Sequence, residues 1–123
     1  MYKVNRTGDD RLDIIMSGKL DVDDMMPMLD TLFQQAKGIE NGRMLIDIEN
    51  FELPSLGALR IELSRLPELF RFTGQFFRMA VLSNEGWVNA LSSVEGKLIP
   101  GLVVRTFRRD QRYQAESWLG SNN

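Results

Sequence analysis

Hydrophobic and polar residues follow two different periods along this chain. Short apolar runs, typical of strands, are followed by turns and then by segments whose apolar residues recur every three or four positions. The runs expected to form strands are Tyr2–Asn5, Leu12–Ser17, Met44–Ile48, Met79–Leu82 and Leu102–Val104. Because helical segments separate the later strands, we expect parallel crossovers and therefore an α/β fold with a mostly parallel sheet.

The first helical segment follows Asp21, a residue suited to an N-cap, and ends at Gly38. Its apolar stripe consists of Val22, Met25, Met26, Leu29, Leu32, Phe33 and Ala36. This spacing places all seven side chains on one face of a helix, where we expect them to pack on the sheet.

Three further helices are predicted. One begins near Ser55, and Pro67 interrupts it, which predicts a kink or two short helices before Gly74. The next covers residues 87–94, and the last runs from about residue 110 to 119. We expect its Ala115, Trp118 and Leu119 side chains to clamp the last helix onto the sheet.

The composition excludes several kinds of catalytic and metal-binding site. The chain has 123 residues, which suits a single domain over residues 1–123, and its net charge of -2 gives no electrostatic case for a nucleic-acid partner. It contains no cysteine and no histidine, so thiolate nucleophiles, imidazole bases and their metal sites are excluded. We expect no cofactor. Neither a signal peptide nor a transmembrane run is recognisable, which predicts a cytoplasmic, bacterial protein.

Several segments, in order along nearly the whole chain, resemble STAS domains, the sulphate-transporter and anti-sigma-factor-antagonist domains. The segments that carry the resemblance are Gly18–Leu20, Ile46–Leu59, Met79–Leu82, Val103–Phe107 and Gln114–Leu119. The last two are similar to the ending of stand-alone SpoIIAA-like bacterial proteins of unassigned function. The resemblance implies a SpoIIAA-like four-turn β-α superhelix, with a mostly parallel mixed sheet and an antiparallel N-terminal strand.

One loop departs from the family pattern. In the antagonist proteins it reads Asp-Ser-Ser/Thr-Gly-Leu-Gly, and a partner kinase phosphorylates a serine in it. Alignment puts Glu52 at the aspartate, Leu53 at the phosphorylated serine and Ser55 at the glycine, whereas Leu56 and Gly57 match. Leu53 cannot accept phosphate. Ser55 is therefore the remaining candidate for a phospho-switch, and its alternative role is a plain helix N-cap.

Acidic residues follow the central strand. Asp47 and Glu49 are two positions apart and point to the same side of a strand, and Glu52 follows them. Carboxylates at the end of a parallel strand can bind Mg²⁺ or work as an acid–base pair. The alternative is structural pairing with nearby arginines such as Arg43 or Arg78.

The segment from residue 66 to 77 concentrates apolar side chains around Pro67 and Gly74. They are Leu66, Leu69, Phe70, Phe72, Phe76 and Phe77. Three interpretations remain open: core packing with a strand starting at Phe76, a dimer surface, or an apolar ligand pocket or membrane-facing flap. Trp87 either lines the mouth of such a pocket or is a half-buried aromatic at a helix start.

These observations favour a non-catalytic, STAS-like regulatory or binding module whose partner is a protein or a small molecule. The candidate binding residues are Glu52, Leu53, Ser55, Gly57, Phe70, Phe72, Phe76, Phe77 and Trp87. One alternative is an apolar-ligand (lipid-like) binding protein that uses the region from Phe70 to Phe77. The other is a carboxylate- or Mg²⁺-dependent enzyme at Asp47, Glu49 and Glu52.

Overall fold

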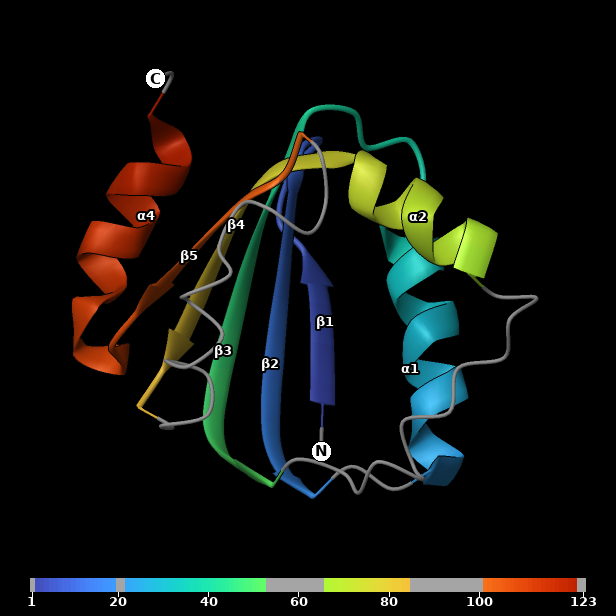
Figure 1. Cartoon of the computed structure of the whole chain (residues 1–123), viewed down its shortest axis with the longest axis horizontal. Helices are drawn as coiled ribbons and strands as arrows, with labels where there is room; N and C mark the ends of the chain where they lie inside the picture. The colour runs from blue at the N-terminus through green and yellow to red at the C-terminus, as the bar shows by residue number, and fades with distance from the viewer. Residues whose placement is uncertain (1, 20–21, 53–65, 85–100, 122–123) are drawn as a thin grey trace.

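A computed structural model describes residues 2–19, 22–52, 66–84 and 101–121 of the chain (Figure 1). The elements are β1 (Tyr2–Arg6), β2 (Arg11–Lys19), α1 (Val22–Gln35), β3 (Gly42–Glu52), α2 (Leu66–Gly74), β4 (Phe76–Ser83), β5 (Val103–Phe107), the 3₁₀ turn η3 (Arg109–Gln111) and α4 (Arg112–Gly120). No helix among these residues is long and apolar enough to cross a bilayer.

The strands form one five-stranded sheet in the order β1-β2-β3-β4-β5. β1 pairs antiparallel with β2, and the other neighbouring pairs are parallel. This is the mixed sheet with an antiparallel N-terminal strand that the sequence predicts. Each expected strand is present, and β3 is longer than expected because it continues to Glu52.

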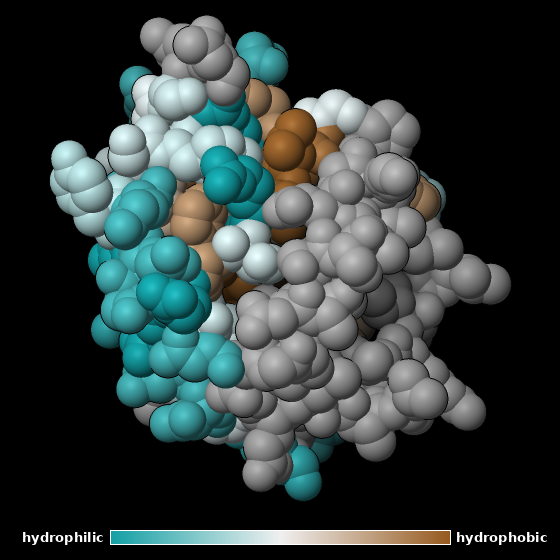
Figure 2. All heavy atoms as spheres, turned by 60° about the vertical axis from the view of Figure 1, so that its left-hand side comes forward, coloured by the Kyte–Doolittle hydropathy of each residue, from teal (hydrophilic) through white to brown (hydrophobic). Residues whose placement is uncertain are grey.

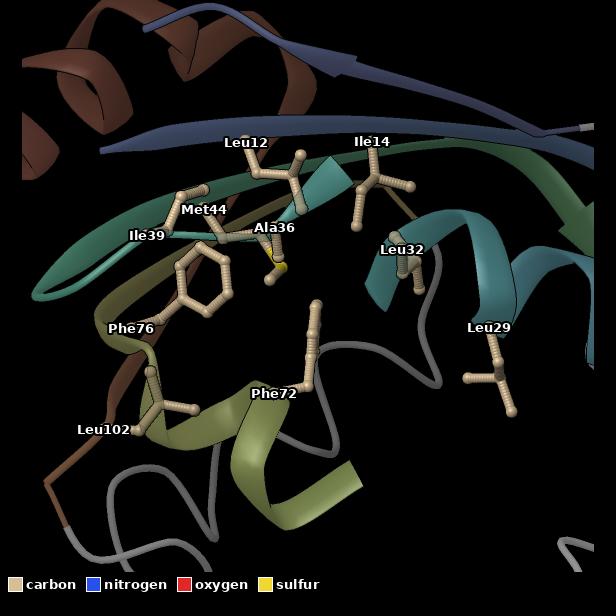
Figure 3. Packing of buried hydrophobic residues seen from close by; sticks show 10 residues of the cluster. All are labelled: Leu12, Ile14, Leu29, Leu32, Ala36, Ile39, Met44, Phe72, Phe76 and Leu102. Atoms are coloured by element: carbon tan, nitrogen blue, oxygen red, sulfur yellow. The ribbon is translucent and has the colours of Figure 1, made fainter. Parts of the chain in front are cut away.

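α1 and α2 cover one face of the sheet (Figure 1). The core on this face joins Leu12 and Ile14 of β2 and Met44 of β3 to Leu32 of α1 and Phe72 of α2. Figure 3 shows Phe72 and Phe76 pointing into the same space as Met44. The apolar stripe of α1 therefore faces the sheet as its spacing predicts, with Pro27 accommodated inside the helix.

α4 lies on the opposite face of the sheet (Figure 1). Ala115 and Leu119 are both 0% exposed and pack against Leu45, Ala80 and Leu82. Trp118 adds a partly buried ring to this cluster, 6.1 Å from the ring of Phe107 between centroids. The predicted clamp is thus confirmed. Seen from the α4 side, the coloured surface is mostly hydrophilic (Figure 2).

α2 begins immediately before Pro67, so this proline lies in the first turn of the helix. Proline is tolerated there because the first backbone N–H groups of a helix have no partner within it. The predicted kink or preceding short helix lies before Leu66, outside the described residues. The predicted helix start near Ser55 and the predicted helix over residues 87–94 lie outside the described residues.

Candidate functional site

The carboxyl ends of the parallel strands meet at one edge of the sheet, which we call the carboxyl edge. β3 ends there at Glu52, and β4 ends there at Ser83, followed by Asn84. β5 reaches the same edge and leads directly into η3, which begins at Arg109. In open α/β sheets this edge is where ligands bind, because loops from several strands converge on it.

A network of charged side chains joins three of these segments. Arg109 donates from Nε to Oδ1 of Asp47 at 2.9 Å and from Nη2 to Oδ2 at 3.4 Å. The same Nη2 lies 3.6 Å from Oε2 of Glu49, and Nη2 of Arg112 lies 3.5 Å from Oδ2 of Asp47. The backbone N–H of Arg109 donates to Oδ1 of Asn84 at 3.1 Å. η3 is therefore attached to the ends of both β3 and β4.

The electrostatics of this network are balanced. The Asp47 side chain is only 12% exposed, and both of its oxygens face guanidinium groups. Its hydrogen bond raises the pKa of the Arg109 guanidinium above the ordinary value. Because guanidinium groups already contact both oxygens of this carboxylate, few of its lone pairs are left for a metal ion.

The predicted structural pairing of Asp47 and Glu49 is therefore present, but with other arginines. Arg43 and Arg78 were the expected partners, and this was wrong. Arg43 shares the Asp47 face of β3 but lies four residues earlier, about 13 Å away at the rise of a strand. Arg43 instead pairs with Asp10 at 2.6 Å. No group of three or more carboxylates within the described ranges is placed to hold a metal ion.

Arg43 and Arg78 form a second polar cluster, at the amino ends of the parallel strands. Arg43 donates to the carbonyl oxygen of Leu119. Arg78 donates to the carbonyl oxygen of Trp118 and, at 2.9 Å each, to the carbonyl and hydroxyl oxygens of Ser121. The ring of Phe77 lies beside both guanidinium groups, 4.9 Å from that of Arg43 and 5.4 Å from that of Arg78. This cluster holds the carbonyl end of α4 to the sheet.

The phenylalanines of the 66–77 segment do not converge on one site. Phe72 and Phe76 are 6% and 3% exposed and their ring centroids lie 5.2 Å apart, so both belong to the core. Phe77 is packed beneath the two arginines, whereas Phe70 is 65% exposed on α2. The predicted strand start at Phe76 is confirmed.

A shallow hollow of ~190 Å³ opens between α1 and α2. Phe33 and Phe72 form its apolar floor, and Glu68, Arg71 and Gln75 line its rim. Of the predicted ligand-binding aromatics that lie in the described ranges, only Phe72 contributes to it. Gln75 ties this side of the hollow to the segment that follows α1, because its Nε2 donates to the carbonyl oxygens of Ala36 and Ile39.

The predicted loop site adjoins the carboxyl edge in the sequence. Glu52 is the last residue of β3, and Leu53, Ser55 and Gly57 follow it outside the described residues, as does Trp87. Sequence reasoning missed Asn84 and Arg109 as parts of this edge. Their only signal is their place in the sequence, because Asn84 follows Leu82 of one strand segment by two residues and Arg109 follows Phe107 of the next by two residues.

A family model described as SpoIIAA-like matches residues 11–120. An uncharacterised protein with a SpoIIAA-like fold from Shewanella loihica PV-4 has a similar structure, with a TM-score of 0.65 and 22% identity over 97% of this chain and 92% of that one. The Bacillus cell-fate determinant SpoIIAA in its phosphorylated form gives a TM-score of 0.50 and 17% identity over 93% of this chain and 97% of that one. No curated protein matches the chain. At these identities, the two structures show the shared fold alone.

Proposed function

This chain belongs to the SpoIIAA-like family, and we propose that it works as a non-catalytic module that binds a partner protein at its carboxyl edge. The fold fits a STAS-type regulatory or binding module, and proteins of this family are generally non-catalytic. The proposed contact surface comprises the end of β3, Asn84 and Arg109, together with the loop residues Leu53, Ser55 and Gly57.

This proposal rests on the ion pairs that Asp47 forms. Its carboxylate is buried at the carboxyl edge, and Arg109 and Arg112 already contact both of its oxygens. With no histidine or cysteine in the chain, carboxylates such as this one are leading candidates for the acid–base groups of an enzyme. The acidic groups of this edge are ion-paired, and the Glu49 side chain is 52% exposed to solvent. Such a surface suits recognition of a charged partner surface better than proton transfer.

Affinity capture with quantitative mass spectrometry tests this function. The wild-type chain, Glu49→Lys and a control, Tyr113→Lys, are used as baits in lysate of the source organism. Tyr113 is 83% exposed on α4, so its variant keeps the fold and introduces a lysine elsewhere. We expect one protein to be retained by the wild type and the control and reduced at least tenfold with Glu49→Lys.

Two results would contradict the proposal. One is equal capture by all three baits. The other is turnover of a metabolite panel by the purified chain that Asp47→Asn combined with Glu49→Gln abolishes, because this would make the edge an enzyme site.

The hollow between α1 and α2 supports a second candidate function, binding of a small apolar ligand. Phe33 and Phe72 lie 5.6 Å apart between ring centroids and offer an aromatic floor. Native mass spectrometry of freshly purified protein tests it. A bound lipid-like mass that Phe33→Ala removes would support this function, and a clean apo mass after gentle purification would count against it.

A further inference from the structure

The rim of the hollow between α1 and α2 carries charged and polar groups above its aromatic floor. The residues that line it from the α2 side lie at i, i+3, i+4 and i+7, so they share one side of the helix and its C-terminal turn. They are Glu68, Arg71, Phe72 and Gln75. Phe33 of α1 lines the same hollow, with its ring centroid 5.6 Å from that of Phe72. The hollow therefore combines two aromatic rings with a carboxylate, a guanidinium and an amide.

The two charged groups of this rim have no ion-pair partner within the described part of the chain. Glu68 is partly buried, and its carboxylate accepts no hydrogen bond from the described residues. Nε of Arg71 lies 3.5 Å from the carbonyl oxygen of Pro67, which is a weak contact. Gln75 donates through Nε2 to two backbone carbonyl oxygens, and this leaves its Oε1 without a donor among the described groups. The rim thus offers a ligand two acceptors, at Glu68 and Gln75, and one cationic donor, at Arg71.

We propose that this hollow binds a free aromatic α-amino acid. The inference rests on the second candidate function, ligand binding between α1 and α2, and gives that ligand one ring and two opposite charges. The ring packs on Phe33 and Phe72. The ammonium group donates to Glu68 and to Oε1 of Gln75, and the carboxylate accepts from Arg71. β-Carbons three residues apart on a helix are about 5–6 Å apart, so Glu68 and Arg71 can both reach the two charged groups on a single α-carbon.

Other classes of small molecule fit this rim less well. A purely apolar ligand removes water from the Glu68 carboxylate without supplying a donor, which is unfavourable. An amine without an acid leaves Arg71 unpaired, and an acid without an amine leaves Glu68 unpaired. The volume of ~190 Å³ is below that of sites for drug-sized molecules, which suits a ligand with a single ring. Because the hollow is shallow and the ligand small, we expect weak binding, with a Kd on the order of 1 mM.

Titrations followed by ¹H–¹⁵N correlation spectra test the class of ligand. L-Phenylalanine is compared with phenethylamine, which lacks the carboxylate, with 3-phenylpropanoate, which lacks the amine, and with L-alanine, which lacks the ring. We expect L-phenylalanine to shift the backbone signals of Arg71, Phe72 and Gln75, with a Kd on the order of 1 mM. Each of the other three compounds is expected to bind about fivefold more weakly or less, because it loses one ion pair or the ring contact.

Two variants test which side chain contacts which charge. Glu68→Gln is expected to weaken L-phenylalanine binding about fivefold and to leave 3-phenylpropanoate binding unchanged, whereas Arg71→Gln weakens L-phenylalanine similarly and leaves phenethylamine unchanged. If the two ring analogues bind the wild type as tightly as L-phenylalanine, the inference is overturned, but ligand binding in the hollow stands. If no ring compound shifts these signals at about 20 mM, the inference also fails, and the native mass spectrum then decides whether the second candidate function stands. Neither result bears on the carboxyl edge.

Discussion

Arg78 provides a sharp test of how α4 is held to the sheet. It is only 6% exposed and has no carboxylate partner among the described residues. Its charge is met by the carbonyl oxygens of Trp118 and Ser121, at the negative end of the α4 dipole, and by the rings of Phe77 and Trp118. We therefore expect Arg78→Met, which keeps much of the aliphatic volume, to destabilise the protein.

The magnitude follows from two opposing effects. A hydrogen bond from a charged donor contributes about 1.5–3 kcal/mol, and Arg78 makes more than one. Removing a buried charge also removes its desolvation cost, which offsets part of the loss. The expected net decrease in the free energy of unfolding is about 2–3 kcal/mol, or roughly 8–12 °C in Tm for a chain of this size.

The assay is urea unfolding followed by tryptophan fluorescence, with Arg105→Met as the matched control. Arg105 stacks on the same Trp118 ring, 5.5 Å from its centroid, but it is exposed and its side chain makes no hydrogen bond within the described part. Its variant is expected to change the free energy of unfolding by less than about 0.5 kcal/mol. Equal losses for the two variants would refute the reasoning, because the stacking alone would then carry the stabilisation.

Three further predictions concern other contacts. The hydrogen bond from Arg11 lowers the pKa of Glu116 below its ordinary value of 4.5, so its stabilising effect is complete above that pH and is lost as pH falls through the lowered pKa. Since Glu116 is 42% exposed, solvent screening limits this effect to below about 1 kcal/mol. Denaturation of the wild type and Glu116→Gln is expected to show a higher free energy of unfolding for the wild type at pH 7 and no difference at pH 3. Gly42→Ala is expected to lower the free energy of unfolding by about 1–3 kcal/mol, because its β-carbon would lie 2.4 Å from Cγ2 of Ile39 in the core. The control Gly120→Ala, whose β-carbon would meet no atom within 4 Å, is expected to leave thermal unfolding almost unchanged. Millimolar MgCl₂ should leave Tm unchanged because Asp47 is already ion-paired, and a rise that Asp47→Asn abolishes would instead indicate a metal site.

Local patterns in the sequence were enough to predict the strands, the described helices and the buried faces of α1 and α4, but not the buried face of α2. The spacing of apolar residues in α1 and the largely apolar runs of β3 and β4 carry this information, because periods of 3.6 and 2 reflect which faces are buried. The same local signals placed Leu119 and Ala115 on the buried face of the last helix. The absence of histidine and cysteine likewise restricts the chemistry, because composition does not depend on how the chain folds.

The pairing of charged groups, in contrast, depends on tertiary packing. Asp47 and Arg109 are 62 residues apart in the sequence, and nothing local to either residue identifies the other as its partner. Arg43 is much nearer to Asp47 in the sequence, but on a strand four residues separate the two side chains by about 13 Å. Likewise, Phe70 and Phe72 look equivalent in the sequence, and only the orientation of α2 makes one exposed and the other core. Helical and strand periods specify faces, whereas long-range pairs depend on how the faces are finally packed.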